Sequence, residues 1–150
     1  MAHRVRQATI LDLEQLAPLF DRYRQFYGRA SDVAAAREFL FARFTDKDST
    51  LLIAHEDERP IGFTQLYPSF SSVSLARILI LNDLFVHEQA RRKGVASALM
   101  SAAVKFASTL GAVRLSLSTA ITNDAAQALY HSAGWKRDDQ FFVYHLAITT

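Results

Sequence analysis

The sequence contains no cysteine, 3 prolines and 5 glycines among its 150 residues, and it has no long uninterrupted apolar run. Without cysteine, the chain has no thiol nucleophile, no thiolate metal site and no disulfide framework. No Pro-rich or Gly-rich linker separates two parts, and no segment has the length of a membrane span or the pattern of a cleaved leader. We therefore expect one domain over residues 1–150, cytoplasmic and without a membrane partner.

Apolar side chains, by contrast, are plentiful enough to build one core. Half of the residues are hydrophobic, and the 11 Phe outnumber the 5 Tyr and the single Trp. A chain of this length can bury roughly two thirds of the surface that it exposes when unfolded. The formal net charge is only +2, so no nucleic-acid partner is expected. The histidines do not have the spacing of metal ligands, and no metal is expected.

Capping residues and helical periodicity predict two helices in the first third of the chain. Thr9 and Asp12 have the spacing of a capping box, and apolar residues then recur at helical spacing toward Gly28. Asp32 can cap a second helix that runs through Phe44.

The rest of the chain predicts a mixed α/β fold. Strands are expected around Val5 and over residues 50–55, 60–67, 75–86 and 113–119, helices over 94–111 and 123–133, and two short strands after Trp135. The strand, helix and strand between residues 75 and 119 form a parallel βαβ unit, whereas the earlier strands are joined as antiparallel hairpins. The expected class is therefore α/β, with a mixed, mostly antiparallel central sheet and helices on both faces.

A basic glycine loop joins the long central strand to the following helix. It consists of Arg91, Arg92, Lys93, Gly94, Val95, Ala96 and Ser97. Unpaired N–H groups at a helix start attract an anion such as pyrophosphate, and small residues let its oxygens reach the backbone. An isolated loop of this kind is more often a turn with solvated charges, so its context has to decide.

That context resembles the GCN5-related N-acetyltransferase family. The loop fits the family's pyrophosphate pattern, Gln/Arg-x-x-Gly-x-Gly/Ala, at Arg91, Gly94 and Ala96. Asn123, followed by a short helix that carries Tyr130 and stops at a glycine and an aromatic residue, resembles a second family segment. The resemblance implies the family's fold from about residue 5 onward, and acetyl transfer from acetyl-coenzyme A to a primary amine. Residues 63–135 look most like the small-amine branch, which includes diamine acetyltransferases and the yeast Hpa-type enzymes.

The resemblance also implies which residues meet the acetyl donor. The central-strand residues Leu84, Phe85 and Val86 would pair with the pantetheine, and the Val86 N–H would meet the thioester carbonyl oxygen. Asn123 would cap its helix, contact the cofactor arm, or do both. Tyr130 would contact the cofactor and act as the general acid that protonates the departing thiolate.

The acceptor side is less well defined. This chain has Asn82 and Asp83 where the resembled amine acetyltransferases carry Glu-Asp, and Asn cannot act as a base. Asp83 could relay a proton through water or hold the ammonium, or it could be a locally hydrogen-bonded strand residue. Aromatic side chains from the first helix and from the 67–72 turn are further candidates for substrate binding: Tyr23, Phe26, Tyr27, Tyr67 and Phe70.

Several alternatives stay open on the sequence alone. The acceptor is expected to be a small amine, a polyamine or an amino-acid-like molecule, which attacks directly within a ternary complex. A protein lysine or N-terminal acetyltransferase, and a module that binds acyl-coenzyme A without turnover, are the other interpretations. The apolar segment from Phe141 to Ile148 could pair across a homodimer.

Overall fold

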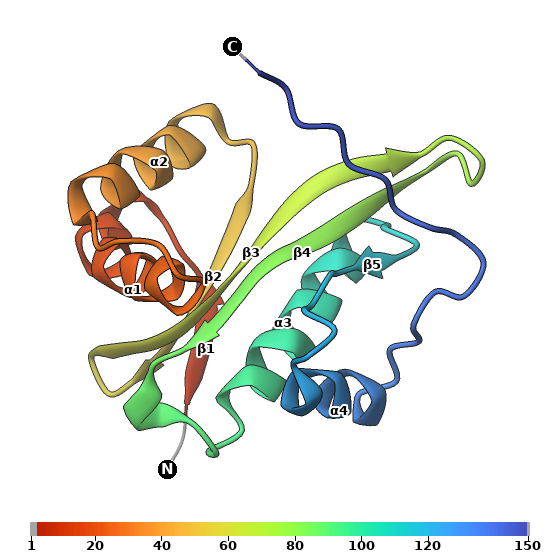
Figure 1. Ribbon diagram of the computed structural model, residues 1–150. Helices are drawn as coiled ribbons and strands as arrows, with labels where there is room; N and C mark the ends of the chain where they lie inside the picture. Colours follow the sequence, from red (N-terminus) through yellow and green to blue (C-terminus); the bar gives the residue numbers. More distant parts are fainter. Residues whose placement is uncertain (1–2, 150) are drawn as a thin grey trace. The chain divides into compact units, whose positions relative to one another are not determined.

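The computed structural model describes residues 3–149, and its contacts gather in two compact units, Met1–Ser118 and Thr119–Thr150. The first unit contains a five-stranded sheet in the order β1-β2-β3-β4-β5 (Figure 1). The strands are β1 (Arg4–Gln7), β2 (Thr50–Glu56), β3 (Arg59–Ser71), β4 (Ala76–Val86) and β5 (Leu115–Ser116). The helices of this unit are α1 (Leu13–Phe26), α2 (Val33–Asp46) and α3 (Val95–Thr109), with short 3-10 turns η1 (Ile10–Asp12) and η2 (Glu88–Ala90).

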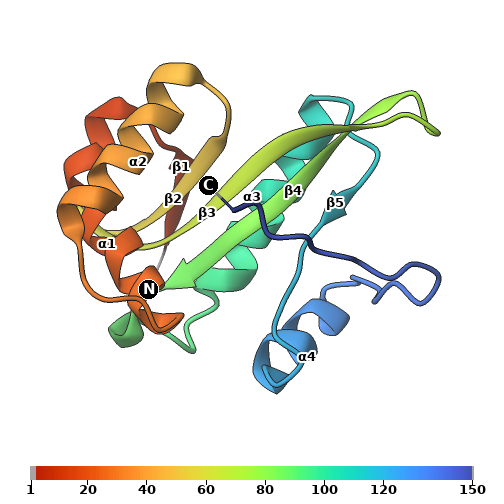
Figure 2. The ribbon, with the colours of Figure 1, turned by 45° about the horizontal axis from the view of Figure 1, so that its top comes forward.

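The sheet is mixed, as the sequence predicts. Strands β1 to β4 pair antiparallel. Strands β4 and β5, which α3 connects along the chain, pair parallel. Helices α1 and α2 cover one face and α3 covers the other (Figures 1 and 2). The expected α/β class, with helices on both faces, is therefore confirmed.

The core lies between α1, α2 and the sheet. The apolar stripe of α1 is buried there with residues of α2, β2, β3 and β4, among them Leu16, Phe20, Leu40, Ile53 and Phe63. Burial of each such side chain contributes about 1.5–3 kcal/mol. This packing fixes α1 against β3 and β4, the strands that carry Gln65 and Asp83.

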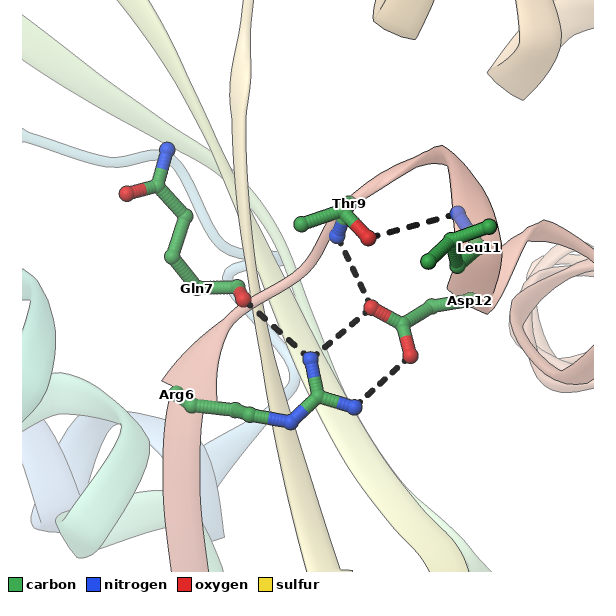
Figure 3. Close-up of polar contacts among 5 residues, drawn as sticks. All are labelled: Arg6, Gln7, Thr9, Leu11 and Asp12. Carbon is green, nitrogen blue, oxygen red and sulfur yellow. Dashed lines mark hydrogen bonds and ion pairs between the residues drawn. The ribbon is translucent and has the colours of Figure 1, made fainter.

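The predicted capping box at the start of α1 is present and has a further partner (Figure 3). Thr9 Oγ1 accepts from the Leu11 N–H, and the Thr9 N–H donates to Asp12 Oδ2 at 2.8 Å. Both terminal nitrogens of Arg6 on β1 donate to the Asp12 carboxylate, at 2.9 and 2.7 Å. The Arg6 guanidinium holds the pKa of Asp12 below its usual range, against the opposing effect of burial. One carboxylate thus joins the first strand to the first helix.

Replacing Asp12 by Asn is expected to lower the free energy of unfolding by about 1–2 kcal/mol at pH 7, because the partly buried pair with Arg6 is broken. The folded-state pKa of Asp12 is depressed, so its stabilising effect is present above the unfolded pKa of about 3.9 and is lost as the pH falls through the folded value. Urea titrations should therefore show the gap between wild type and variant closing below about pH 4. The exposed Arg37–Glu14 pair supplies the control, because Glu14→Gln should change stability by less than about 1 kcal/mol. A gap that does not depend on pH would contradict the assigned charge effect.

The second unit contains one helix, α4 (Asp124–Ser132), within residues 119–149. Asn123 caps it, and it ends before Gly134, whose φ of 93° is the left-handed value that favours glycine after a helix. The two strands expected after Trp135 are not formed in the described part of this unit, so that prediction is wrong for this structure. Apolar, β-prone side chains alone cannot make a strand, because a strand also needs a hydrogen-bonded neighbour. The strand predicted over residues 113–119 is likewise shortened to Leu115–Ser116.

Candidate active site

The central strand β4 contains one residue more than its partner β3 at the middle of their ladder. Asp83 lies opposite Gln65, whereas Leu81 lies opposite Leu66, so Asn82 is the extra residue. Such a β-bulge changes which backbone groups face each neighbouring strand. The sequence places polar residues at this point but gives no direct sign of the bulge.

After the bulge, some backbone N–H and C=O groups of β4 point away from β3, to a side where no strand pairs with them. The His87 N–H donates to the Ile61 carbonyl at 2.7 Å, toward β3. Backbone groups of successive strand residues alternate in direction, so those of Val86 and Leu84 point away from β3. The parallel ladder with β5 ends at Ile80, so in residues 3–118 no strand pairs with this edge. The Val86 N–H predicted from the sequence therefore lies on an unpaired edge.

Asp83 is the centre of a buried polar network. Its side chain accepts from the Tyr23 hydroxyl at 2.8 Å, from Gln65 Nε2 at 2.9 Å and from Asn82 Nδ2 at 3.1 Å, and the residue is 7% exposed. Gln65 in turn accepts from Ser49 Oγ at 2.8 Å. The carboxylate thereby joins α1, β3 and β4. Three expected site residues, Tyr23, Asn82 and Asp83, are brought together here.

Sequence reasoning missed Gln65. An amide in the buried middle of a strand is a usable signal, because a buried polar group needs partners. The identity of its partner, Asp83, depends on the strand register, which the bulge sets and which the sequence does not state.

The other aromatic candidates differ in how near they lie to this network. The Tyr27 ring lies 5.2 Å from Tyr23 and 5.4 Å from Phe26, measured between centroids, so the end of α1 carries an aromatic cluster. Burial, and then the negative charge of Asp83, raise the pKa of Tyr67, which places this phenol in the electrostatic reach of the network. Phe70 is not brought to it, because it lies five residues along β3 from the partner of Asp83, about 17 Å.

The aromatic end of α1 is held by a second buried carboxylate, Asp21. It accepts from the Asp32 N–H at 2.7 Å, from Ser31 Oγ at 2.7 Å and from Gln25 Nε2 at 3.0 Å. Burial alone would raise the pKa of Asp21, but these donors outweigh it and the pKa is lowered. The turn between α1 and α2 is therefore fixed by hydrogen bonds rather than by apolar packing.

The glycine loop opens α3 as predicted. Gly94 is the N-cap residue with a φ of 79°, and a Cβ placed on it would meet nothing within 4 Å. The first bond within the helix runs from the Ala98 N–H to the Gly94 carbonyl, and no side chain caps the helix start. The N–H groups of the first helical turn, at Val95, Ala96 and Ser97, therefore have no acceptor within the helix.

The three cations of the loop have different surroundings. Arg91 Nε donates to the Val86 carbonyl at 3.0 Å, turning back toward β4. Lys93 Nζ lies 3.9 Å from Glu56 Oε2. Arg92, at a left-handed φ of 65°, makes no hydrogen bond or ion pair in the part of the chain that the structure describes. The three cations of the loop therefore lie in three different environments.

Gly62 is a second residue that sequence reasoning missed. A Cβ at this position would lie 2.9 Å from the Phe85 carbonyl oxygen and 3.2–3.3 Å from the side chains of Leu99 and Val95. Glycine therefore allows α3 to pack closely on β3 and β4, which sets the height of the helix start above the sheet. An isolated glycine inside a strand pattern is the signal for such a close approach.

In the second unit, the two expected site residues are on or beside α4. Asn123 Oδ1 accepts from the Ala126 N–H at 3.1 Å, so it is the N-cap that the sequence predicts. The centroids of the Tyr130 and Trp135 rings are 6.1 Å apart, and the backbone N–H of Trp135 donates to the Tyr130 carbonyl at 3.0 Å. The half-buried Tyr130 is thereby held at the end of its own helix.

Two features of the described residues bear on other kinds of function. Over residues 3–149, no three or more His, Asp or Glu side chains are grouped so that they could hold a metal ion. No helix within the same range combines the length and the apolar character that crossing a membrane requires.

The mixed sheet, the unpaired edge of β4 at Val86 and the glycine-opened helix form the arrangement that the resemblance to coenzyme A-dependent acetyltransferases implied. Residues 13–135 match the model of the acetyltransferase (GNAT) family, and the chain belongs to this family. It is an acetyl-coenzyme A-dependent N-acetyltransferase. The family resemblance of its sequence motifs is thereby confirmed.

Relatives match over the greater part of the chain. An uncharacterized N-acetyltransferase, YhfO, of Bacillus subtilis (strain 168) is 49% identical over 144 residues, covering 96% of this chain and 97% of that protein. The D-amino-acid N-acetyltransferase HPA3 of Saccharomyces cerevisiae is 33% identical over 102 residues, covering 65% of this chain and 63% of that protein. A crystal structure of a probable acetyltransferase is 46% identical, with a TM-score of 0.93 and coverage of 98% of this chain and 99% of that one.

Proposed function

We propose that the acceptor is a small primary amine, a polyamine or an amino-acid-like molecule, which attacks acetyl-coenzyme A directly in a ternary complex. The observation that carries this proposal is the buried Asp83 carboxylate, bonded to Tyr23 and placed three residues before Val86 on the same strand. A carboxylate attracts an ammonium group, and aromatic faces can pack against its alkyl part. The yeast relative that acetylates D-amino acids supports an amino-acid-like acceptor.

The donor site that we propose uses the backbone of β4 and the start of α3. The pantetheine would pair along Leu84, Phe85 and Val86, as an added strand pairs with a sheet edge. The pyrophosphate would be bound by the N–H groups of the loop from Arg91 to Ser97, where helix geometry leaves donors unpaired and the dipole favours an anion. Asn123 would contact the cofactor arm. No metal enters this scheme.

In the proposed reaction, the amine nitrogen bonds to the thioester carbonyl carbon, and the carbon–sulfur bond then breaks. The Val86 N–H stabilises the oxyanion that forms on the carbonyl oxygen. Tyr130 donates its phenolic proton to the departing thiolate and regains a proton from the amine nitrogen, which loses one as the amide forms. Transfer from a phenol with a pKa near 10 to a thiolate whose conjugate acid has a pKa near 8.5 is uphill by about 2 kcal/mol, and the proton returned by the nitrogen offsets this cost.

The acceptor must also lose a proton before it attacks. Deprotonating an alkylammonium with a pKa near 10.4 at neutral pH costs about 4–5 kcal/mol. We propose that Asp83 favours this step, by holding the ammonium and passing its proton to water. Of the two carboxylate oxygens, Oδ1 accepts from Tyr23 and Asn82 whereas Oδ2 accepts from Gln65, which leaves Oδ2 with room for one more donor.

Assays of acetyl-coenzyme A consumption with amines of graded pKa test this function. Wild type should turn over small cationic amines, and Asp83→Asn should reduce kcat/KM about 100-fold for amines with a pKa near 10 but about 10-fold or less for weakly basic ones. Gln65→Met is the matched control, because it breaks the same network and keeps the carboxylate. It should lower the melting temperature and reduce activity equally for all amines, since an unsatisfied buried group costs about 1–3 kcal/mol.

Two results would count against the proposal. Equal losses across all amines in Asp83→Asn, with the same drop in melting temperature as Gln65→Met, would make Asp83 a structural residue only. Turnover of lysine-containing peptides but of no small amine would replace the small-molecule acceptor by a protein.

We extend the proposal to the whole chain. Residues 1–150 would act as one catalytic domain, in the cytoplasm and without a nucleic-acid or membrane partner. A homodimer would form through the segment from Phe141 to Ile148, whose large apolar side chains are 76–89% exposed and form a run that monomeric proteins seldom leave in water.

A further inference from the structure

Arg91 contacts three residues on two elements of the first unit, β4 and α1. Its Nε donates to the Val86 carbonyl at 3.0 Å, in a partly buried hydrogen bond. Its guanidinium carbon lies 5.5 Å from the centroid of the Phe85 ring on β4 and 5.7 Å from that of Phe26, the last residue of α1. These contacts aim the guanidinium at the central strand and at the end of α1.

We infer that Arg91 is a positioning residue for acetyl transfer, which fixes the peptide group after Val86 and joins the phosphate loop to the aromatic end of α1. The inference rests on the donor site proposed above, in which the Val86 N–H meets the thioester oxygen. It gives Arg91 a different task from Arg92, its neighbour in the same motif.

The chemistry at Val86 explains why such a residue is useful. In a strand, the N–H and the C=O of one residue point to the same side, so both groups of Val86 face the unpaired edge. The N–H favours a developing oxyanion there, whereas an uncovered carbonyl oxygen would repel it. Arg91 covers that oxygen with a charged donor and leaves the N–H as the group presented to the substrate.

The aromatic contacts fix the guanidinium in place. A planar guanidinium stacks on aromatic rings, and two such rings restrict its orientation more than a hydrogen bond alone does. Phe85 belongs to the donor strand and Phe26 to the aromatic cluster expected to line the acceptor site. Arg91 therefore connects the two substrate sides through contacts that do not involve phosphate.

The test compares Arg91→Met with Arg92→Met. Arg91→Met keeps the apolar stem and removes the donor and the charge; it should lower kcat about 10- to 100-fold while the Kd for coenzyme A changes less than about 3-fold. Arg91→Gln, which keeps an N–H donor, should recover part of the lost kcat. Arg92→Met should instead weaken coenzyme A binding. The difference in Kd between wild type and Arg92→Met should shrink as the salt concentration is raised.

A spectroscopic readout separates positioning from general damage. The ¹³C resonance of the Val86 carbonyl reports the hydrogen bond that this oxygen accepts, and it should move upfield in Arg91→Met but not in Arg92→Met. A folded Arg91→Met protein with unchanged kcat and a Kd for coenzyme A raised 10-fold or more would overturn the inference and make Arg91 a phosphate ligand. An unmoved Val86 resonance would also overturn it. Wild-type protein that neither binds coenzyme A nor consumes acetyl-coenzyme A would instead refute the donor site itself.

Discussion

Replacing Tyr130 by Phe is expected to lower kcat about 100-fold or more while the KM for acetyl-coenzyme A changes little. In the proposed mechanism, the phenol is needed when the thiolate leaves, whereas docking of the donor uses backbone groups of the strand and the loop. The half-buried ring and its packing with Trp135 should be kept by Phe, and a melting curve would show whether the variant is folded. Steady-state and single-turnover rates measured together would locate the loss in the chemical step.

Tyr144→Phe is the matched control for this prediction. Tyr144 also lies in the second unit but is 89% exposed, and removing its hydroxyl should leave kcat within about twofold. A Tyr130→Phe protein whose single-turnover rate equals that of wild type would exclude Tyr130 as the general acid.

Replacing Gly94 by Val is expected to weaken coenzyme A binding about 100-fold, as measured by calorimetry. Gly94 has a φ of 79°, which a β-branched residue adopts only at a cost of about 1–3 kcal/mol. No atom lies within 4 Å of a Cβ on Gly94, so the side chain itself would not clash within the described structure. It would instead occupy the space in front of the unpaired N–H groups, where the phosphate oxygens are proposed to bind.

Gly111, near the other end of α3, provides a close control. Its φ of 72° is also left-handed and its Cβ position is also open. Gly111→Val should therefore lose a similar amount of stability and retain its affinity for coenzyme A. Equal losses of affinity in both variants would trace the effect to a strained helix and remove the case for a phosphate site at Gly94.

Features set by a few neighbouring residues could be predicted from the sequence. The capping box at Thr9 and Asp12, the cap at Asp32 and the helix start at the Gly94 loop are each decided within one helical turn, and all are present. The family motif at the loop adds the fold, because its residues follow a strand and open a helix as the pattern requires. These local signals were enough for the order of the elements up to α4.

Features that depend on register could not be predicted. The bond between Gln65 and Asp83 joins residues 18 apart, and it exists because the ladder shifts at Asn82. The contacts of Arg91 were equally hidden, since its charge alone suggested a phosphate ligand. The segment from Phe141 to Ile148 shows the opposite failure, because its composition is typical of a strand while the described structure forms none there.

The bulge at Asn82 sets how β4 pairs with β3 from Asp83 onward. In the unbulged alternative, every later residue slips by one, Asp83 moves away from Gln65, and the Val86 N–H turns inward toward β3. The bonds from Tyr23 and Gln65 to Asp83 form only in the bulged pairing, so they stabilise it against the slip. The Asp83 carboxylate proposed for the acceptor and the Val86 N–H proposed for the donor are therefore set by a single choice of alignment, and a slipped strand would misplace both at once.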